Sequence, residues 1–368
     1  MNDPETEVMC VTPTLEGGGA ERLLTNIALQ PSVSGRISVV TLMAGGVFRR
    51  PLEEGGVAVM DLGMTGNRDL PRGVFRLAAL IRARRPAAVI GWMYHGNLLA
   101  FLAVLLAGRH TPLFWGIFCT DVRSSESLLV RVVRWLNTLL SPFVDGVIYN
   151  ADEARDFHHR IGFRERRSIV IANCIEPRLF RQDPRKGEEL RAELGIDGND
   201  IIVAVVARVD PQKDWDTVRE AVRDLPGVVT LAIGTGTDRL PPQPGFIGLG
   251  WRDDVVAILS AADIFLMGSA FGEGTSLALS EAMLCGLPCV VTDVGGNPAL
   301  IGDGGIVVPA RNAAELREAL LQLAGDGSGR AALGRVARTR AAAVLPPDDV
   351  ARQLYLLTAN AGNLTQAS

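Results

Sequence analysis

The sequence is poor in several features that mark particular classes of protein. Only two of its 37 basic residues are lysines, and only 5% of its 368 residues are aromatic. Its five cysteines are scattered, without the close pairs of a zinc or redox motif. The longest uncharged apolar run, residues 98–108, is too short to cross a bilayer as a helix. Since repeats, low-complexity tracts and heptads are also missing, the sequence argues against a metal finger, a membrane-spanning protein and a solenoid.

The first residues of the chain and its net charge indicate in which compartment the protein works and which partners it can have. The first residues, MNDPETE, are acidic and polar, unlike a secretory signal peptide, and the cysteine count is odd, so we expect a cytoplasmic protein. Residues 1–172 hold 19 arginines against 16 acidic residues (+3), and the remainder holds 18 basic against 25 acidic residues (−7). This balance is too weak for a nucleic-acid partner, but the positive half could favour an anionic membrane surface.

What the sequence does contain is a regular alternation of short apolar runs and helical stretches. The apolar runs are residues 8–12, 37–42, 57–62, 87–92, 112–118, 146–150, 168–172, 201–207, 228–233, 246–250, 263–267, 288–292 and 305–309. Continuous apolar strands separated by helices predict parallel sheets that are covered on both faces. The length suits two domains, so we predict an α/β protein with two doubly wound Rossmann-like domains, 1–172 and 173–348, facing a cleft.

Two loops that follow predicted strands can bind anions. In EGGGAER, residues 16–22, three glycines leave backbone N–H groups open at a helix N-terminus, which suits phosphate, although a simple tight turn is the alternative. In ARVDPQKDW, residues 207–215, the charges of Arg208 and Lys213 can converge on one anion. A chain that otherwise uses arginine keeps a lysine here, which favours a site for a compact point charge, although a solvated loop is the alternative.

Three further stretches also follow strands. IGTGTDRL and LGWRDD, residues 233–240 and 249–254, lie either at a ligand edge or in simple turns. GEGTSLALSEAMLCGLP, residues 272–288, places Glu273 at a helix start and Glu281 two turns inside the helix. The amides at this helix start can bind phosphate, and the two carboxylates can accept from sugar hydroxyls. A ligand with one anionic group and two hydroxyl-rich rings would be a nucleoside diphosphate sugar. The alternative is that the two glutamates belong to an ordinary helix start.

The ordered set of these motifs resembles the retaining glycosyltransferases of family 4, which have the GT-B architecture, over nearly the full length. The most specific element is the E-x7-E pattern from Glu273 to Glu281, which continues as EAMLCGLPCVVTDVGGNP. The resemblance implies that Glu281 holds the ribose of the donor and that Glu273 contacts the transferred sugar. It also implies that Arg208 and Lys213 neutralise the diphosphate leaving group.

The same resemblance implies the remaining donor contacts. The glycine-rich loop would approach the β-phosphate, and the 249–252 loop would lie beside the base. The expected donor-binding residues are Gly18, Gly19, Gly234, Gly236, Trp251, Arg252, Gly274, Thr275, Ser276, Leu277 and Glu281. We expect no cofactor and no metal, because such enzymes usually bind diphosphate with side-chain cations and helix dipoles. Asp214 and Asp216 form a D-x-D pair, but at a helix start they are interpreted as caps and surface charge.

The first domain would bind the acceptor, and the final helix, 349–368, would cross back onto it. In the family, the fifth strand often ends in a histidine near the reacting sugar, where this chain has Cys119. The nearby histidine is His95, which is either catalytic or a hydrogen-bonded structural residue. The candidate catalytic residues are Arg208, Lys213, Glu273, His95 and Cys119.

The sequence therefore predicts a glycosyltransferase that moves a hexose from a nucleotide diphosphate sugar, UDP-linked by expectation, to an acceptor hydroxyl with retention. Polysaccharide, lipopolysaccharide or other glycoconjugate assembly would be its setting, with a lipid-linked or glycan acceptor. The apolar and basic segment 128–140 suggests peripheral contact with the inner face of the cytoplasmic membrane. Two alternatives stay open: a UDP-sugar epimerase of similar architecture, and a non-catalytic partner subunit that binds sugar nucleotides.

Overall fold

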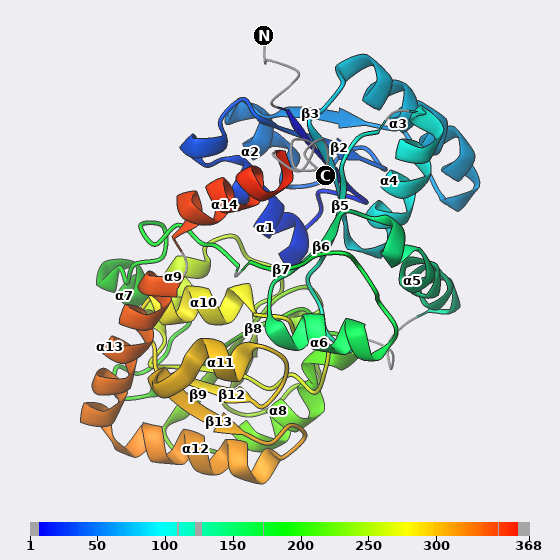
Figure 1. The fold of residues 1–368 in the computed structure, drawn as a ribbon. Coiled ribbons are helices and arrows are strands. Elements are labelled where there is room, and N and C mark those ends of the chain that lie inside the picture. The colour runs from blue at the N-terminus through cyan, green and yellow to red at the C-terminus, as the bar shows by residue number, and fades with distance from the viewer. Residues whose placement is uncertain (1–6, 109, 122–126, 172, 345, 360–368) are drawn as a thin grey trace. The chain divides into compact units, whose positions relative to one another are not determined.

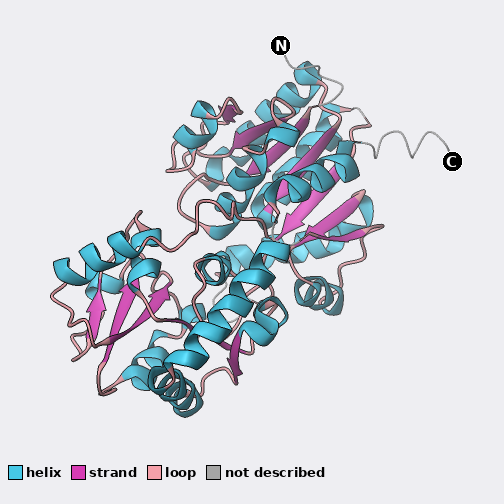
Figure 2. Ribbon diagram, turned by 90° about the vertical axis from the view of Figure 1, so that its left-hand side faces the viewer, coloured by secondary structure: helices cyan, strands magenta, loops and turns pink. Residues whose placement is uncertain are grey.

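The fold is taken from a computed structural model of the chain. The structure describes residues 7–108, 110–121, 127–171, 173–344 and 346–359. Contacts divide the chain into two compact units, which we call unit 1 (residues 1–174 and 346–368) and unit 2 (residues 175–345). Each unit is a parallel β-sheet with helices on both faces (Figures 1 and 2). The predicted architecture of two doubly wound α/β domains is confirmed.

Unit 1 contains a seven-stranded sheet in the order β3-β2-β1-β4-β5-β6-β7. Its strands are β1 (Val8–Thr12), β2 (Ile37–Thr41), β3 (Ala58–Asp61), β4 (Ala88–Trp92), β5 (Leu113–Ile117), β6 (Gly146–Tyr149) and β7 (Ser168–Val170). Each strand coincides with or lies within one of the first seven apolar runs. The chain winds outward in one direction from β1 and in the other from β4. The carboxyl ends of these two strands therefore form the switch point at which doubly wound sheets bind ligands.

The helices of unit 1 cover both faces because side chains alternate along each buried strand. They are α1 (Gly19–Ala28), α2 (Arg49–Glu54), α3 (Leu70–Arg84), α4 (Met93–Ala107), α5 (Leu128–Leu140), α6 (Asp152–Arg160) and α14 (Pro347–Ala359), with short 3₁₀ turns η2 (Pro31–Val33), η3 (Asn67–Asp69) and η4 (Ser141–Phe143). Met9 and Val11 share a core with α3 to α6, whereas Val8 and Cys10 share one with α1, α2 and α14.

The C-terminal helix α14 belongs to unit 1, although it follows unit 2 in sequence. Leu354 and Tyr355 pack into the core beside α1, and the backbone N–H of Ser32 donates to Asp348 Oδ1 at 2.9 Å. Of the predicted final helix 349–368, residues 360–368 lie outside the described residues. Among the helices that the structure describes, none is long and apolar enough to cross a membrane.

Unit 2 contains a six-stranded sheet in the order β10-β9-β8-β11-β12-β13. Its strands are β8 (Ile201–Val206), β9 (Val228–Ile233), β10 (Phe246–Gly248), β11 (Ile264–Met267), β12 (Cys289–Thr292) and β13 (Gly305–Val308). Here the strand order reverses between β8 and β11, so their carboxyl ends form the switch point of this unit. The loops that carry the predicted donor motifs follow β8, β9, β10 and β11.

The helices of unit 2 also form two layers around the sheet (Figure 2). They are α7 (Pro184–Glu193), α8 (Trp215–Val222), α9 (Val255–Ala261), α10 (Leu277–Leu284), α11 (Asn297–Ile301), α12 (Ala313–Gly325) and α13 (Gly327–Val344), with 3₁₀ turns η5 (Pro211–Lys213), η6 (Thr237–Arg239) and η7 (Gly302–Gly304). Trp215 and Val218 of α8 and Leu316 and Leu320 of α12 form one buried core with the sheet. Helix α10 carries the stretch with the two glutamates and packs against β11, β12 and α13.

Candidate active site

The switch point of unit 2 brings together two residues that lie 60 positions apart in the sequence. Lys213 Nζ donates a hydrogen bond to Glu273 Oε1, and the two form an ion pair. The side chains are only 15% and 7% exposed, so water screens the pair weakly. The loops are also joined by their backbones, because the N–H of Ala270 donates to the carbonyl of Gln212 at 2.8 Å. The pair therefore lies at the junction of the β8 and β11 loops.

The Glu273 carboxylate is held by its surroundings. Ser269 Oγ donates to Glu273 Oε1 at 2.6 Å, and Thr292 Oγ1 donates to the Ser269 carbonyl at 2.6 Å. Gly295 lies against the Glu273 backbone with φ 61°, and a Cβ there would meet the Glu273 carbonyl oxygen at 1.9 Å. Only glycine fits such an approach with a positive φ. These contacts fix Glu273 at the carboxyl edge of the sheet.

Arg208 lies in the same loop as Lys213 but makes a different ion pair. Its guanidinium pairs with Asp210 at 3.3 Å, and its side chain is 55% exposed. Its backbone carbonyl accepts from Trp215 Nε1 at 3.0 Å, which fixes the loop to α8. Asp214 caps α8, because its carboxylate accepts from the backbone N–H of Thr217, and it also accepts from the Thr217 hydroxyl at 2.7 Å.

The two glycine-containing turns beyond β9 and β10 are joined to each other. Gly234 N–H donates to the Gly250 carbonyl at 2.8 Å, and Gly250 N–H donates to Thr237 Oγ1 at 2.9 Å. Gly234 has φ 137°, and a Cβ there would lie 2.2 Å from the carbonyl oxygen of Ala207, so glycine is required for this close approach. Gly236 is the N-cap of η6, with φ 91°. The two predicted turns and the β8 loop thus form one contiguous edge.

Trp251 and Arg252 occupy this edge in different ways. The Trp251 side chain is 60% exposed and leaves a flat aromatic surface open to stacking. Arg252 forms a two-pronged pair with Asp254 at 2.7 and 2.6 Å. This hydrogen bonding raises the pKa of Arg252 and lowers the pKa of Asp254. The guanidinium therefore stays charged beside Trp251.

The start of α10 is a capped helix N-terminus. Ser276 Oγ accepts from the backbone N–H of Leu279, and the N–H of Ser276 donates to Asn297 Oδ1 at 2.9 Å. The Ser276 amide is thus engaged, and a phosphate at residues 274–277 would have to displace Asn297 or use the neighbouring amides. Gly274 is held through its carbonyl, which accepts from the N–H of Gly296 at 2.8 Å, and Leu277 is buried. Thr275 is half-buried.

Glu281 lies inside α10 and is only 1% exposed. Its neighbour one turn further on, Cys285, is also buried. Burial raises the pKa of the Cys285 thiol to about 12, and the nearby Glu281 charge adds to that shift. Glu281 is therefore a buried acid on the helix whose first turn follows Glu273.

In unit 1, the glycine-rich loop follows β1 as predicted, but a carboxylate covers it. Gly18 is the N-cap of α1, and Gly19 is the first residue of that helix. A Cβ on Gly18 would meet Glu21 Oε2 at 2.0 Å, because the Glu21 side chain folds back over the helix N-terminus. Thr14 Oγ1 donates to the same carboxylate at 3.4 Å. A phosphate in this position would have to displace Glu21.

Cys119 lies at the carboxyl end of β5 in a buried chain of hydrogen bonds. Its thiol lies 3.8 Å from the Tyr94 hydroxyl, which lies 2.7 Å from His158 Nε2. His158 Nδ1 lies 2.7 Å from the carbonyl of Ala154, which can only accept, so Nδ1 carries the hydrogen and Nε2 accepts from Tyr94. Burial lowers the pKa of His158 to about 4, so this histidine is neutral at physiological pH.

His95 was a candidate from the sequence, whereas His158 was not. His95 is half-buried in the first turn of α4, and burial lowers its pKa. His158 contacts Tyr94 across 64 sequence positions, a contact that no local pattern indicates. The available signal was the pair His158-His159 in DFHHRIGF, since adjacent residues on a helix point about 100° apart and one of them can be buried.

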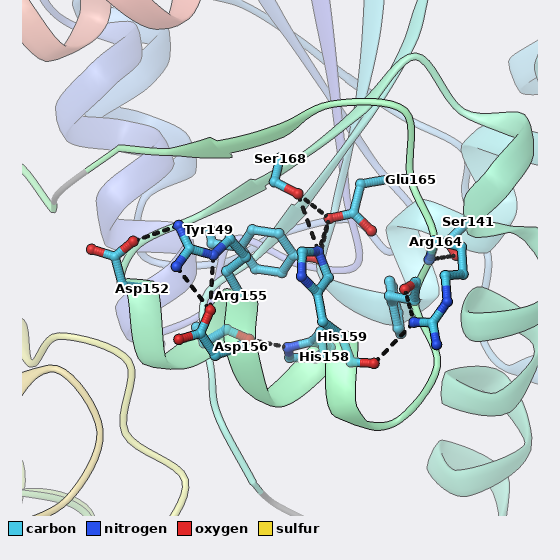
Figure 3. Close-up of polar contacts among 12 residues, drawn as sticks. Ser141, Tyr149, Asp152, Arg155, Asp156, His158, His159, Arg164, Glu165 and Ser168 are labelled. Carbon is cyan, nitrogen blue, oxygen red and sulfur yellow. Dashed lines mark hydrogen bonds and ion pairs between the residues drawn. The ribbon is translucent and has the colours of Figure 1, made fainter.

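His159, the exposed partner of this pair, belongs to a second polar cluster (Figure 3). Glu165 Oε1 accepts from the Tyr149 hydroxyl at 3.0 Å and from Ser168 Oγ at 2.6 Å, and it lies 2.8 Å from His159 Nε2. Burial alone would raise the pKa of Glu165, but the hydrogen bonds from Ser168 and His159 outweigh it and lower the pKa. This cluster ties α6 to the start of β7.

Comparisons with known proteins agree with the two units. Residues 17–174 match the family model "Glycosyl transferase 4-like domain", and residues 200–326 match "Glycosyl transferases group 1". Each match lies within one unit, residues 17–174 in unit 1 and residues 200–326 in unit 2, and both models describe glycosyltransferase domains. The matched ranges include Gly18, Cys119, Lys213 and Glu273.

Two curated relatives are similar over part of their length. UDP-Gal:alpha-D-GlcNAc-diphosphoundecaprenol alpha-1,3-galactosyltransferase of Escherichia coli is 32% identical over 36% of this chain and 38% of the relative. D-inositol 3-phosphate glycosyltransferase of Mycobacterium tuberculosis (strain ATCC 25177 / H37Ra) is 30% identical over 54% of this chain and 45% of the relative. The chain thus matches less than half the length of these relatives.

Solved structures share the fold over the full chain. Anabaena Alr3699/HepE in complex with UDP-glucose superimposes with a TM-score of 0.84 at 21% identity, covering 98% of this chain and 99% of that one. Sucrose-phosphate synthase from Thermosynechococcus elongatus superimposes with a TM-score of 0.81 at 16% identity, covering 98% and 100%. At these identities the likeness establishes the fold.

Proposed function

We propose that this protein is a glycosyltransferase that moves a hexosyl group from UDP to an acceptor hydroxyl with retention of anomeric configuration. The observation that carries the proposal is the Lys213–Glu273 pair at the switch point of unit 2, where a lysine from the β8 loop and a fixed acid from the β11 loop meet. Its support from relatives is that a protein of the same fold binds UDP-glucose, and that the E. coli relative uses UDP-Gal.

In this proposal, unit 2 holds the donor. Lys213 and Arg208 bind the diphosphate, Glu273 contacts the transferred sugar, and Glu281 holds the ribose. Trp251 supplies the aromatic surface for the base, since its ring is exposed beside the turns that approach the β8 loop. No metal is needed, because side-chain cations and the α10 N-terminus supply the positive charge.

The main contribution to the rate is stabilisation of the departing diphosphate. As the glycosidic bond breaks, negative charge grows on the phosphate oxygens, and Lys213 lies in a weakly screened position where a cation acts strongly. Retention follows when the acceptor attacks from the face that the diphosphate leaves, with the leaving phosphate accepting the proton of the acceptor. The protein then needs no nucleophile of its own.

A donor screen tests this proposal. The purified protein is incubated with individual nucleotide diphosphate sugars without acceptor, and slow release of each nucleoside diphosphate is followed. We expect release from UDP-hexoses in the wild type and strongly reduced release in Lys213→Ala. Conversion of the sugar to its epimer without net UDP loss would identify an epimerase. Tight UDP binding without release, with or without glycan acceptors, would identify a non-catalytic partner subunit.

We further propose that the acceptor is lipid-linked or a membrane-associated glycan, and that unit 1 contacts the cytoplasmic face of an anionic membrane. Helix α5 carries the argument, because Leu128, Val132, Trp135 and Leu139 form one stripe and are 75%, 47%, 60% and 56% exposed. Phe143, just beyond the helix, is 69% exposed.

Charge on the same face favours a lipid surface. Helices α3, α4 and α5 contain six arginines and no aspartate or glutamate. All three contribute to the same core on one side of the sheet. Between α3 and α4 lies a shallow apolar cavity of about 460 Å³, which is lined by Val74, Phe75 and Leu105 among others. Arg84 pairs with Glu7, and the other arginines of these helices accompany apolar side chains, a combination that matches an anionic bilayer surface.

Vesicle co-sedimentation tests this contact. We expect binding to phosphatidylglycerol-containing vesicles that weakens with added salt, and little binding to pure phosphatidylcholine. Trp135→Ser combined with Leu139→Ser should abolish it. The matched control is Leu179→Ser with Leu321→Ser, which removes two exposed apolar side chains (66% and 43%) from unit 2 and should leave binding unchanged. Dimerisation of the wild type that the first variant abolishes, without vesicle binding, would assign the face to a protein contact.

A further inference from the structure

We propose that Glu273 competes with the donor diphosphate for Lys213, so that the Lys213–Glu273 ion pair weakens UDP binding and favours product release. This inference rests on the proposed function and assigns Glu273 a role besides contact with the sugar. The starting point is that Lys213 and Glu273, which are proposed to contact different parts of the donor, form an ion pair with each other.

The competition follows from which partner is fixed. Glu273 is anchored by the Ser269 hydroxyl at 2.6 Å, by Gly295 packed against its backbone, and by the bond from Gly296 N–H to the Gly274 carbonyl at 2.8 Å. Lys213 lies at the end of η5 on a long flexible side chain that is 15% exposed. Lysine is therefore the member that can turn from one anion to another, while the carboxylate stays in place.

A diphosphate at this edge meets two opposing charges. It attracts Lys213 but is repelled by the Glu273 carboxylate, which is only 7% exposed and therefore weakly screened. In the wild type, the gain from the Lys213–phosphate bond is reduced by the loss of the Lys213–Glu273 bond. After transfer, the Glu273 carboxylate can recapture Lys213 as UDP leaves.

The direction in which one mutation changes the affinity for UDP distinguishes competition from a purely structural role of Glu273. Glu273→Gln keeps the size of the side chain but removes its charge, so Lys213 is released for the phosphate and the repulsion disappears. UDP should then bind about 3- to 30-fold more tightly, the size of coupling between contacting charged side chains. A residue that merely supports the loop would weaken UDP binding when it is changed.

The experiment is isothermal titration of UDP into the full-length wild type, Glu273→Gln, Lys213→Ala and the double variant. We expect Lys213→Ala to bind UDP more weakly than wild type, because Glu273 then faces the diphosphate uncompensated. The double variant should regain part of that loss relative to Lys213→Ala. Glu318→Gln on exposed α12 is the matched control with the same change in net charge and should bind like wild type.

Two further titrations sharpen the result. Inorganic pyrophosphate should also bind more tightly to Glu273→Gln, whereas uridine, which lacks phosphate, should bind equally to both proteins. Glu273→Ala should shift UDP binding in the same direction and serves if the glutamine variant does not fold.

The outcomes separate the inference from the function on which it rests. Unchanged or weaker UDP binding by both Glu273 variants, with wild type binding UDP, overturns the competition and leaves the proposed donor site standing. Absence of nucleoside diphosphate binding by the wild type overturns both.

Discussion

The switch points of the two sheets share one topology but differ in charge. In unit 2, a lysine and an acid meet between the β8 and β11 loops, so a cation is present where an anionic ligand would bind. In unit 1, the loop after β1 offers only backbone amides, and the Glu21 carboxylate lies over them. Equal folds therefore do not imply equal ligands. The difference favours unit 2, rather than the loop after β1, as the main site for the diphosphate.

The units also differ in titratable groups. All four histidines of the chain lie in unit 1, and the buried one, His158, is fixed in its neutral form by Tyr94 and Ala154. Unit 2 has no histidine, and its proposed donor site contains the Lys213–Glu273 ion pair. Lowering the pH from 7 should therefore destabilise unit 1 before it changes the charges of the proposed donor site.

The largest expected effect is a loss of folding stability at low pH, which arises from His158 in unit 1. Burial lowers the pKa of His158 from 6.5 to about 4, so between these values the unfolded chain binds a proton that the native chain does not. Stability is then complete above pH 6.5 and falls as the pH drops towards 4, by about 3 kcal/mol in total at about 1.4 kcal/mol per pKa unit. Urea unfolding of the wild type at pH 7 and pH 4.5 measures this loss.

His158→Gln removes the buried imidazole and should flatten that dependence, whatever its own stability at pH 7. His159→Gln is the matched control, because His159 is 41% exposed and lies on the next position of α6. An equally steep acid loss in both variants would place the sensitive group elsewhere.

The second prediction contrasts the two lysines of unit 2. Lys213→Ala should reduce turnover about 10- to 150-fold, because a charge-assisted hydrogen bond contributes about 1.5–3 kcal/mol. Lys186→Ala should be nearly silent, because Lys186 is exposed on α7, where its backbone N–H bonds to the Asp183 cap. Initial rates with a UDP-hexose donor decide between them. Equal losses would contradict the specific role of Lys213.

The sequence predicted where the residues of the unit 2 site lie but not which of them pair. The positions of Lys213 and Glu273 followed from apolar runs, because loops after neighbouring parallel strands meet at one edge. Their pairing did not follow, since a sequence pattern gives the loop and not the direction of a flexible side chain. Arg208 illustrates the same point, because it lies in the expected loop yet pairs with Asp210.

Unit 1 was less predictable for a physical reason. The glycine pattern indicated an open helix N-terminus, but the Glu21 side chain lies back over it, since helix N-termini attract carboxylates. The contact between Cys119, Tyr94 and His158 joins three elements, β5, α4 and α6, whose proximity exists only in the folded sheet. Such long-range polar contacts have no local signature.

The third prediction concerns the buried acid of α10. Glu281→Gln should weaken UDP binding about 10-fold, since a hydrogen bond from a ribose hydroxyl to a charged carboxylate is lost. Binding of inorganic pyrophosphate should be unchanged, because pyrophosphate has no ribose. Titration of both ligands into the variant makes the test. Equal weakening of both would show that Glu281 supports the loop rather than the sugar.

The smallest expected effect sharpens the comparison at the loop after β1. Glu21→Gln removes the negative charge that lies over the N-terminus of α1, so the amides at Gly18 and Gly19 become more attractive to a phosphate. Charges at a helix N-terminus contribute about 0.3–1 kcal/mol, so UDP should bind about 2- to 5-fold more tightly. Glu153→Gln, at an exposed position in the first turn of α6, is the control with the same change in charge. Isothermal titration of UDP measures both. If UDP binds equally to Glu21→Gln and wild type, the glycine-rich loop takes no part in holding the diphosphate, and unit 2 alone provides the anion site.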